Sequence, residues 1–184
     1  MVNPNFITLL RGQKPPLFCI LLVISIFFYP TTPQAETYLP PEDFINNSFN
    51  GNPPATDVLW INKSLRQQAE KILAHKPGFL RTRYRKQDSK SVWILDEIGK
   101  TKPITVGIVI NQGKIETVKV LSFRESRGWE VKHDFFTKQY INAQLKDDLQ
   151  LNQNIDGISG ATLSVRAVTK LAKLALLFDQ EIRQ

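Results

Sequence analysis

Two runs of apolar and β-branched residues, ITVGIVI at 104–110 and IETVKVL at 115–121, flank the tetrapeptide NQGK at 111–114. Such runs, joined by a few residues that include glycine, are typical of a β-hairpin, because Gly113 can adopt positive φ without strain. We therefore expect residues 104–121 to form the centre of an antiparallel sheet.

Further strands and the helices that cover them are expected on either side of this hairpin. Residues 79–86 alternate in polarity, with a row of arginines on one face, and residues 91–96 form a second apolar run. This basic row indicates a solvated face, or else a docking surface for an acidic partner. Apolar residues at helical spacing predict helices over 62–75 and 165–182, and Asp134 would cap a third helix over 134–148. The fold class expected is α+β, with a small antiparallel sheet covered by helices and a long C-terminal helix.

The N-terminal residues have the pattern of a targeting segment. Residues 1–14 contain basic but no acidic residues, and residues 17–29 are apolar but shorter than the roughly 20 residues of a membrane span. We predict a signal peptide over 1–35, cut after Ala35; the alternative is an uncleaved N-terminal membrane anchor. Residues 36–56 are rich in proline and asparagine and are expected to be an extended linker, and residues 57–184 a single domain.

Charge and cysteine content exclude several classes of function. The formal charge is +7; without the two basic residues of the leader it is 22 − 17 = +5, which suits acidic partners or anionic lipids. With an export signal, nucleic acid is not an expected partner. The only cysteine, Cys19, lies in the leader, so we expect no disulfide, Cys-ligated iron–sulfur cluster or attached haem in the folded part. Neither His75 nor His133 belongs to a metal-ligating cluster by spacing, so no metal site is expected.

The stretch DGISGATLS at 156–164 directly precedes the last predicted helix. A helix N-terminus carries unpaired N–H groups and a partial positive charge, so it can hold a phosphate. Gly157 and Gly160 allow tight bends and close approach of a ligand. From the local chemistry alone, the favoured interpretation is that Thr162 or Ser164 simply caps the helix.

The run Asp156-x-x-Ser159-Gly160-Ala161-Thr162 resembles the flavinylation motif of the FMN-binding domain family, which occurs in subunits of sodium-translocating NADH:quinone reductase and of Rnf complexes. The resemblance spans residues 101–177. It implies that a flavin transferase esterifies the Thr162 hydroxyl with the phosphate of FMN, and that Asp156 belongs to what the transferase recognises. The cofactor-binding residues would then be Thr162 with Ser159, Gly160, Ala161, Leu163 and Ser164.

A second segment, FRESRGWEV at 123–131, is also similar to this family, in which it helps to wall the flavin pocket. By this resemblance Gly128 would allow close backbone approach, and Trp129 would lie against the isoalloxazine ring. Glu125 or Arg127 would hydrogen-bond the flavin edge. If the family resemblance is set aside, Trp129 is expected to be an aromatic residue of the core or its edge, and Glu125 is expected to form an ion pair on the surface.

The resemblance implies an exported electron-transfer flavoprotein that is periplasmic, or attached to the inner membrane by an uncut leader. Besides the flavin transferase, its partner would be a cytochrome, a quinone-linked protein or a reductase subunit. No motif of an independent catalyst is present in the sequence. Two alternatives stay open: a reductase module that binds FMN without a covalent bond, and an exported binding or structural protein without a cofactor.

Overall fold

The computed structural model describes residues 36–183. The predicted signal peptide or anchor, residues 1–35, lies outside the described residues. Among the helices that the structure does describe, none combines the length and the apolar character needed to cross a bilayer.

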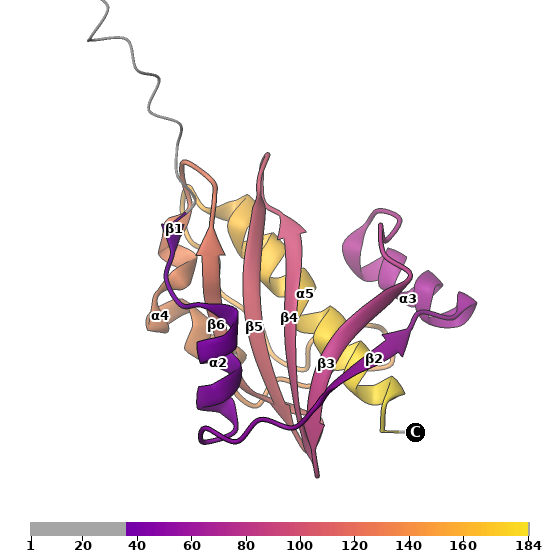
Figure 1. Ribbon diagram of the computed structural model, residues 1–184. Coiled ribbons are helices and arrows are strands. Elements are labelled where there is room, and N and C mark those ends of the chain that lie inside the picture. The colour runs from indigo at the N-terminus through magenta and orange to yellow at the C-terminus, as the bar shows by residue number, and fades with distance from the viewer. Residues whose placement is uncertain (1–35, 184) are drawn as a thin grey trace, which may run out of the picture. The chain divides into compact units, whose positions relative to one another are not determined.

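Six antiparallel strands form one sheet, in the order β1-β6-β5-β4-β3-β2 (Figure 1). This sheet, the helices that flank it and the long final helix confirm the predicted α+β class. In chain order the elements are β1 (Glu36–Thr37), α2 (Pro41–Ser48), β2 (Thr56–Trp60), α3 (Lys63–Leu73), β3 (Arg81–Gln87), β4 (Lys90–Ile98), β5 (Pro103–Asn111), β6 (Lys114–Phe123), η3 (Trp129–Lys132), α4 (Asp134–Thr137), η4 (Lys138–Tyr140) and α5 (Thr162–Glu181).

The predicted hairpin is present as β5 and β6 at the centre of the sheet. Asn111 pairs with Lys114, which leaves Gln112 and Gly113 as the turn. Both turn residues have positive φ, +52° and +76°, and this conformation matches the right-handed twist of the two strands. The strands predicted over 79–86 and 91–96 are also present, as β3 and β4.

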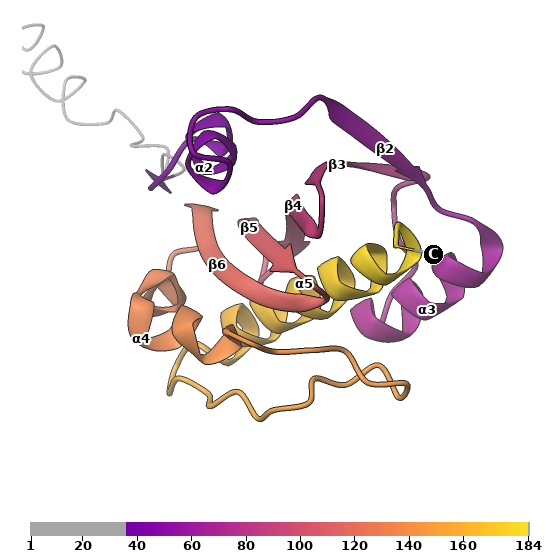
Figure 2. The same ribbon diagram turned by 90° about the horizontal axis from the view of Figure 1, so that it is seen from below.

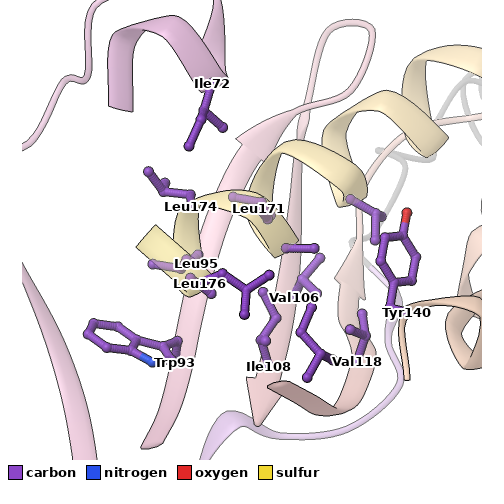
Figure 3. Close-up of a cluster of buried hydrophobic side chains, with 14 of the residues drawn as sticks. Ile72, Trp93, Leu95, Val106, Ile108, Val118, Tyr140, Leu171, Leu174 and Leu176 are labelled. Atoms are coloured by element: carbon purple, nitrogen blue, oxygen red, sulfur yellow. The ribbon is translucent and has the colours of Figure 1, made fainter. Parts of the chain in front are cut away.

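The main hydrophobic core lies between the sheet and the helices α3 and α5, which cover the same face (Figure 2). Figure 3 shows Leu95, Val106 and Ile108 of the sheet pointing toward Leu171 and Leu176 of α5. Full burial of one such aliphatic side chain contributes about 1.5–3 kcal/mol relative to leaving it exposed. This face therefore fixes α5, and with it the start of that helix, against β4 and β5.

Helix α3 confirms the helix predicted over 62–75. It begins after Asn62, whose side-chain oxygen accepts the Leu65 N–H at 2.8 Å and so caps the helix. The predicted apolar face is buried: Leu65, Ala69, Ile72 and Leu73.

The prediction of an extended linker over residues 36–56 is wrong. Glu36 of β1 pairs with Phe123 at the end of β6, and α2 packs on the face of the sheet opposite α5 (Figure 2). The prolines that suggested a linker start this helix, because the first helical residue needs no N–H donor. A second core forms beneath it from Phe44, Ile45, Phe49, Val92, Val109 and Leu121.

The prediction of a helix over residues 134–148, capped by Asp134, is also wrong. Helical structure ends at Tyr140, and the residue that precedes α4 is His133, whose side chain makes no cap. Beyond it the Asn142 N–H donates to the Ile115 carbonyl at 2.8 Å, and the Ile115 N–H donates to the Ala143 carbonyl at 3.0 Å. Pairing with the start of β6 thus replaces the helical bonds that the sequence pattern favoured.

Candidate functional site at the start of the last helix

Helix α5 begins within the motif and leaves its N-terminal donors available. Ala161 is the N-cap residue and provides no side-chain cap; its carbonyl accepts the Val165 N–H at 2.9 Å. Within residues 36–183, no acceptor bonds to the backbone N–H groups of Thr162, Leu163 and Ser164. The first turn of this fully described helix also contains no acidic residue. Unpaired donors and the positive end of a 20-residue helix dipole therefore meet here, as anion binding requires.

Thr162 is the first residue of α5, and it is exposed. The structure does not support the interpretation in which Thr162 or Ser164 caps the helix, because both residues lie inside it and neither makes a cap in the described part of the chain. Ser159 and Gly160 are exposed beside Thr162, and Gly160 takes a φ of +81° in the turn that leads into the helix. Thr162 is thus an exposed hydroxyl-bearing residue at the positive end of the helix.

The fold brings the second predicted segment to the same place. Gly128 packs so closely on the start of α5 that an added Cβ would lie 2.4 Å from Ser164 Oγ and 3.5 Å from Ala161 Cα. Its φ of +86° belongs to the left-handed region, which favours glycine. Gly128 lies 28 residues before the start of the motif at Asp156, yet the two form one surface. Only a residue without a side chain fits this contact.

Gly128 is followed by an exposed aromatic ring. Trp129, the first residue of η3, is 46% exposed, and its ring meets the His133 ring edge-on at a centroid distance of 5.4 Å. Leu163, one residue into α5, is also exposed at 40%. A large apolar side chain on each of the two segments thus remains in solvent close to the Gly128 contact, and both could be covered by a flat ring system.

Comparison with known proteins supports this reading of the surface. Residues 99–177 match the family model of the FMN-binding domain. These residues form an FMN-binding domain. The match confirms the family and the range that the sequence motifs indicated, and it identifies a flavin-binding protein. A search of curated proteins gave no match to the chain.

The residues at the start of α5 fit the chemistry of FMN. The backbone N–H groups of Thr162, Leu163 and Ser164, which have no acceptor within residues 36–183, suit its phosphate, and Thr162 is exposed beside them. The close packing of Gly128 on Ser164 holds the loop with Trp129 at this helix start. Trp129 offers an aromatic face of the kind on which a flavin ring can lie. The matched range begins at the turn after β4 and ends inside α5, so it contains both segments of the site.

Glu125 has a defined partner elsewhere in the FMN-binding domain. Its carboxylate accepts the backbone N–H groups of Lys100, Thr101 and Lys102 at 2.5–2.8 Å and so closes the turn between β4 and β5. Partial burial raises the pKa of this carboxyl, but the three backbone donors together outweigh that effect and hold the pKa below its ordinary value. The structure thus gives Glu125 a structural role, and its predicted bond to the flavin edge would have to compete with these donors.

Asp156 is exposed and is held by the loop that precedes the motif. Its backbone N–H donates to Gln139 Oε1 at 2.7 Å, and its carboxylate accepts from Asn154 Nδ2 at 3.2 Å. The carboxylate therefore stays accessible to another protein. This placement agrees with the recognition role that the family resemblance implies, although it does not test that role.

Sequence reasoning missed Lys132. Its Nζ lies 5.2 Å from the centroid of Trp129 and 3.9 Å from that of Tyr38 in the segment after the leader. Residues three apart eclipse each other in a 3₁₀ helix, so the pair Trp129 and Lys132 could have been recognised only once η3 was known. Lys132 adds positive charge next to the aromatic ring of the site.

Proposed function

We propose that this flavin-binding protein carries FMN joined to Thr162 by a phosphoester and works as an exported electron carrier. The observation that supports it most directly is that Thr162, which bears a hydroxyl, is exposed as the first residue of a helix without a side-chain cap. Formation of the ester replaces the O–H bond of Thr162 with an O–P bond. The leaving group of an activated flavin nucleotide departs from phosphorus, and the hydroxyl proton passes to a base of the transferase.

The chain's own residues account for how the phosphate would be held. The ester keeps negative charge, which the N–H groups of Thr162, Leu163 and Ser164 can stabilise at the helix terminus. The absence of an acidic residue from the first turn of this described helix removes a source of repulsion. The contact of Gly128 with Ser164 holds the second segment at this helix start, and Trp129 and Leu163 offer apolar surface for the ring system.

When bound, FMN supplies one-electron and two-electron redox chemistry. We propose that electrons arrive from a membrane or periplasmic donor and pass to an acceptor protein: a cytochrome, a quinone-linked protein or a reductase subunit. The exposure of Trp129 and Leu163 supports this role, because a partner could reach a flavin held there. The leader predicted over residues 1–35 supports export.

The test is in-gel flavin fluorescence after full denaturation, on protein produced together with a flavin transferase. Thr162→Val keeps the β-branched shape but removes the hydroxyl, whereas Ser126→Ala removes an exposed hydroxyl from the loop before Gly128. We expect a fluorescent band in the native protein and in Ser126→Ala, and none in Thr162→Val. A band that persists in Thr162→Val would place the ester elsewhere.

The same samples distinguish the two alternatives. Yellow protein that loses its flavin on acid precipitation would be a non-covalent FMN-dependent module. Colourless protein in the presence of active transferase would be a binding or structural protein without a cofactor. Either result would overturn the covalent proposal.

A further inference from the structure

The positive charge of the described chain is concentrated before the matched FMN-binding domain. Residues 57–86 contain eight Lys and Arg and two Asp and Glu, a net charge of 8 − 2 = +6. Residues 36–184 together have a net charge of only +5. This segment comprises β2, α3 and nearly all of β3, and it lies outside the matched range 99–177. Its charge therefore belongs to a part of the chain that the family match does not explain.

The β2–β3 pairing places the arginines on one face. Trp60 lies opposite Arg81, Val58 opposite Arg83, and directly paired residues of antiparallel strands share a face. The next pair, Thr56 with Arg85, continues the same row. The alternate residues Leu59 and Tyr84 pack against the main core instead. We call the outward residues Thr56, Val58, Trp60, Arg81, Arg83 and Arg85 the basic ribbon.

The tip of the basic ribbon exposes large apolar side chains. Trp60 is 64% exposed, and the Arg81 guanidinium lies 5.4 Å from the centroid of its ring. Leu80, whose carbonyl accepts the Ile61 N–H, is 69% exposed at the same end of the two strands. An apolar pair of this size costs free energy in water, so its exposure at one tip points to a partner.

Two of the three arginines are available to that partner. Within residues 36–183, Arg81 and Arg83 make no ion pair, whereas Arg85 donates to the Pro54 carbonyl at 2.6 Å and lies 3.8 Å from Glu42. Helix α2 packs on the same face of the sheet, where it contacts Val92, Val109 and Leu121 of β4, β5 and β6 (Figure 2). Between α2 and the ribbon lies an open cavity of about 260 Å³, and Arg83 contributes to its lining.

We propose that the basic ribbon contacts an anionic lipid surface, with Trp60 and Leu80 in the headgroup region and Arg81 and Arg83 on lipid phosphates. Tryptophan prefers the membrane interface, and each basic side chain near an anionic bilayer strengthens attachment. The exposed Trp60 and Leu80 suit the membrane interface. Arg81 and Arg83, which make no ion pair within residues 36–183, suit the lipid phosphates. This contact is independent of flavin attachment at Thr162.

The test uses the flavin-free full chain, so that the leader is the same in every sample. The protein is reconstituted into vesicles of phosphatidylglycerol and phosphatidylcholine whose acyl chains carry bromine, a quencher of tryptophan fluorescence. We expect quenching in the native protein and in Trp129→Phe, and its loss in Trp60→Phe. All these positions are exposed, so the variants should fold, which circular dichroism checks.

Charge is tested by reversing two positions. Arg81→Glu with Arg83→Glu should reduce the quenched fraction by about half or more, because attachment weakens severalfold for each basic side chain lost. Lys100→Glu with Lys114→Glu changes the net charge equally on exposed residues elsewhere and should leave quenching unchanged. Equal quenching in native protein and Trp60→Phe, or equal effects of the two charge reversals, would overturn the lipid contact and leave the ribbon to an acidic protein.

Discussion

Replacement of Gly128 by alanine tests whether the contact between the two segments of the flavin site is as tight as the structure shows. The new Cβ would lie 2.4 Å from Ser164 Oγ and 3.2 Å from Ser164 Cβ. Gly160→Ala is a matched control, because Gly160 has a similar φ of +81° but, among the described residues, no heavy atom within 4 Å of its added Cβ.

The cost of each substitution can be separated into two contributions. Alanine in the left-handed region costs about 1–2 kcal/mol relative to glycine, and this applies to both positions. Overpacking of a close contact adds about 1–3 kcal/mol, and this applies to Gly128 alone. We therefore expect a loss of unfolding free energy of about 2–5 kcal/mol for Gly128→Ala and about 1–2 kcal/mol for Gly160→Ala.

The assay is urea unfolding followed by circular dichroism, with Ser164→Ala as the second member of a double-mutant cycle. Removal of Ser164 Oγ relieves the 2.4 Å contact, so Gly128→Ala combined with Ser164→Ala should recover about 1 kcal/mol or more. Equal losses for Gly128→Ala and Gly160→Ala, together with no recovery in the double variant, would refute the reasoning. In that case Gly128 would not hold its loop against the start of α5.

Two further predictions concern other parts of the fold. Phe44→Ala should lower the unfolding free energy by about 3–5 kcal/mol in the same urea assay, because Phe44 of α2 is buried against the sheet. A loss below about 0.5 kcal/mol, which is typical of a surface position, would restore the interpretation of residues 36–56 as a linker. Glu125→Gln should cost about 1–3 kcal/mol at pH 7 through weaker bonds to three backbone donors. Because the folded pKa of Glu125 is below its unfolded value, its ionised form stabilises the fold above about pH 4.5, and this stabilisation is lost as pH falls through the folded pKa. The difference in urea midpoint between the native protein and Glu125→Gln should therefore be smaller at pH 3 than at pH 7. An equal difference at the two pH values would contradict this role of Glu125.

The strongest local patterns predicted the centre of the fold correctly. The hairpin of β5 and β6 needed only its β-branched runs and Gly113, and α3 needed only its apolar face and the Asn62 cap. Helix α2 was missed because its eight residues follow Pro40, begin with Pro41 and bury only Phe44 and Ile45, which is too short a pattern to distinguish from a linker. The helix predicted beyond Tyr140 failed for the opposite reason: its local pattern was adequate, but Asn142 and Ala143 pair with Ile115.

The candidate site shows the same division between local and tertiary information. The motif and the segment around Gly128 could each be found in the sequence, and the resemblance placed both in one pocket. The contact of Gly128 with Ser164 could not be predicted in detail, because it depends on how β6 and α5 pack on a common core. The role of Glu125 at the turn after β4 was missed for a related reason, since its three donors come from a segment more than 20 residues earlier.

The exposure of the site bears on why a covalent bond would be needed. Sites that hold a cofactor without a bond usually bury most of its surface. Here Ser159, Thr162, Leu163 and Trp129 are all exposed, so a flavin laid on them would keep much of its surface open to solvent and to partners. Openness favours electron exchange between proteins but weakens non-covalent retention, and dilution after export would remove a loosely held cofactor. The proposed ester at Thr162 would resolve this conflict, because retention would then no longer depend on burial.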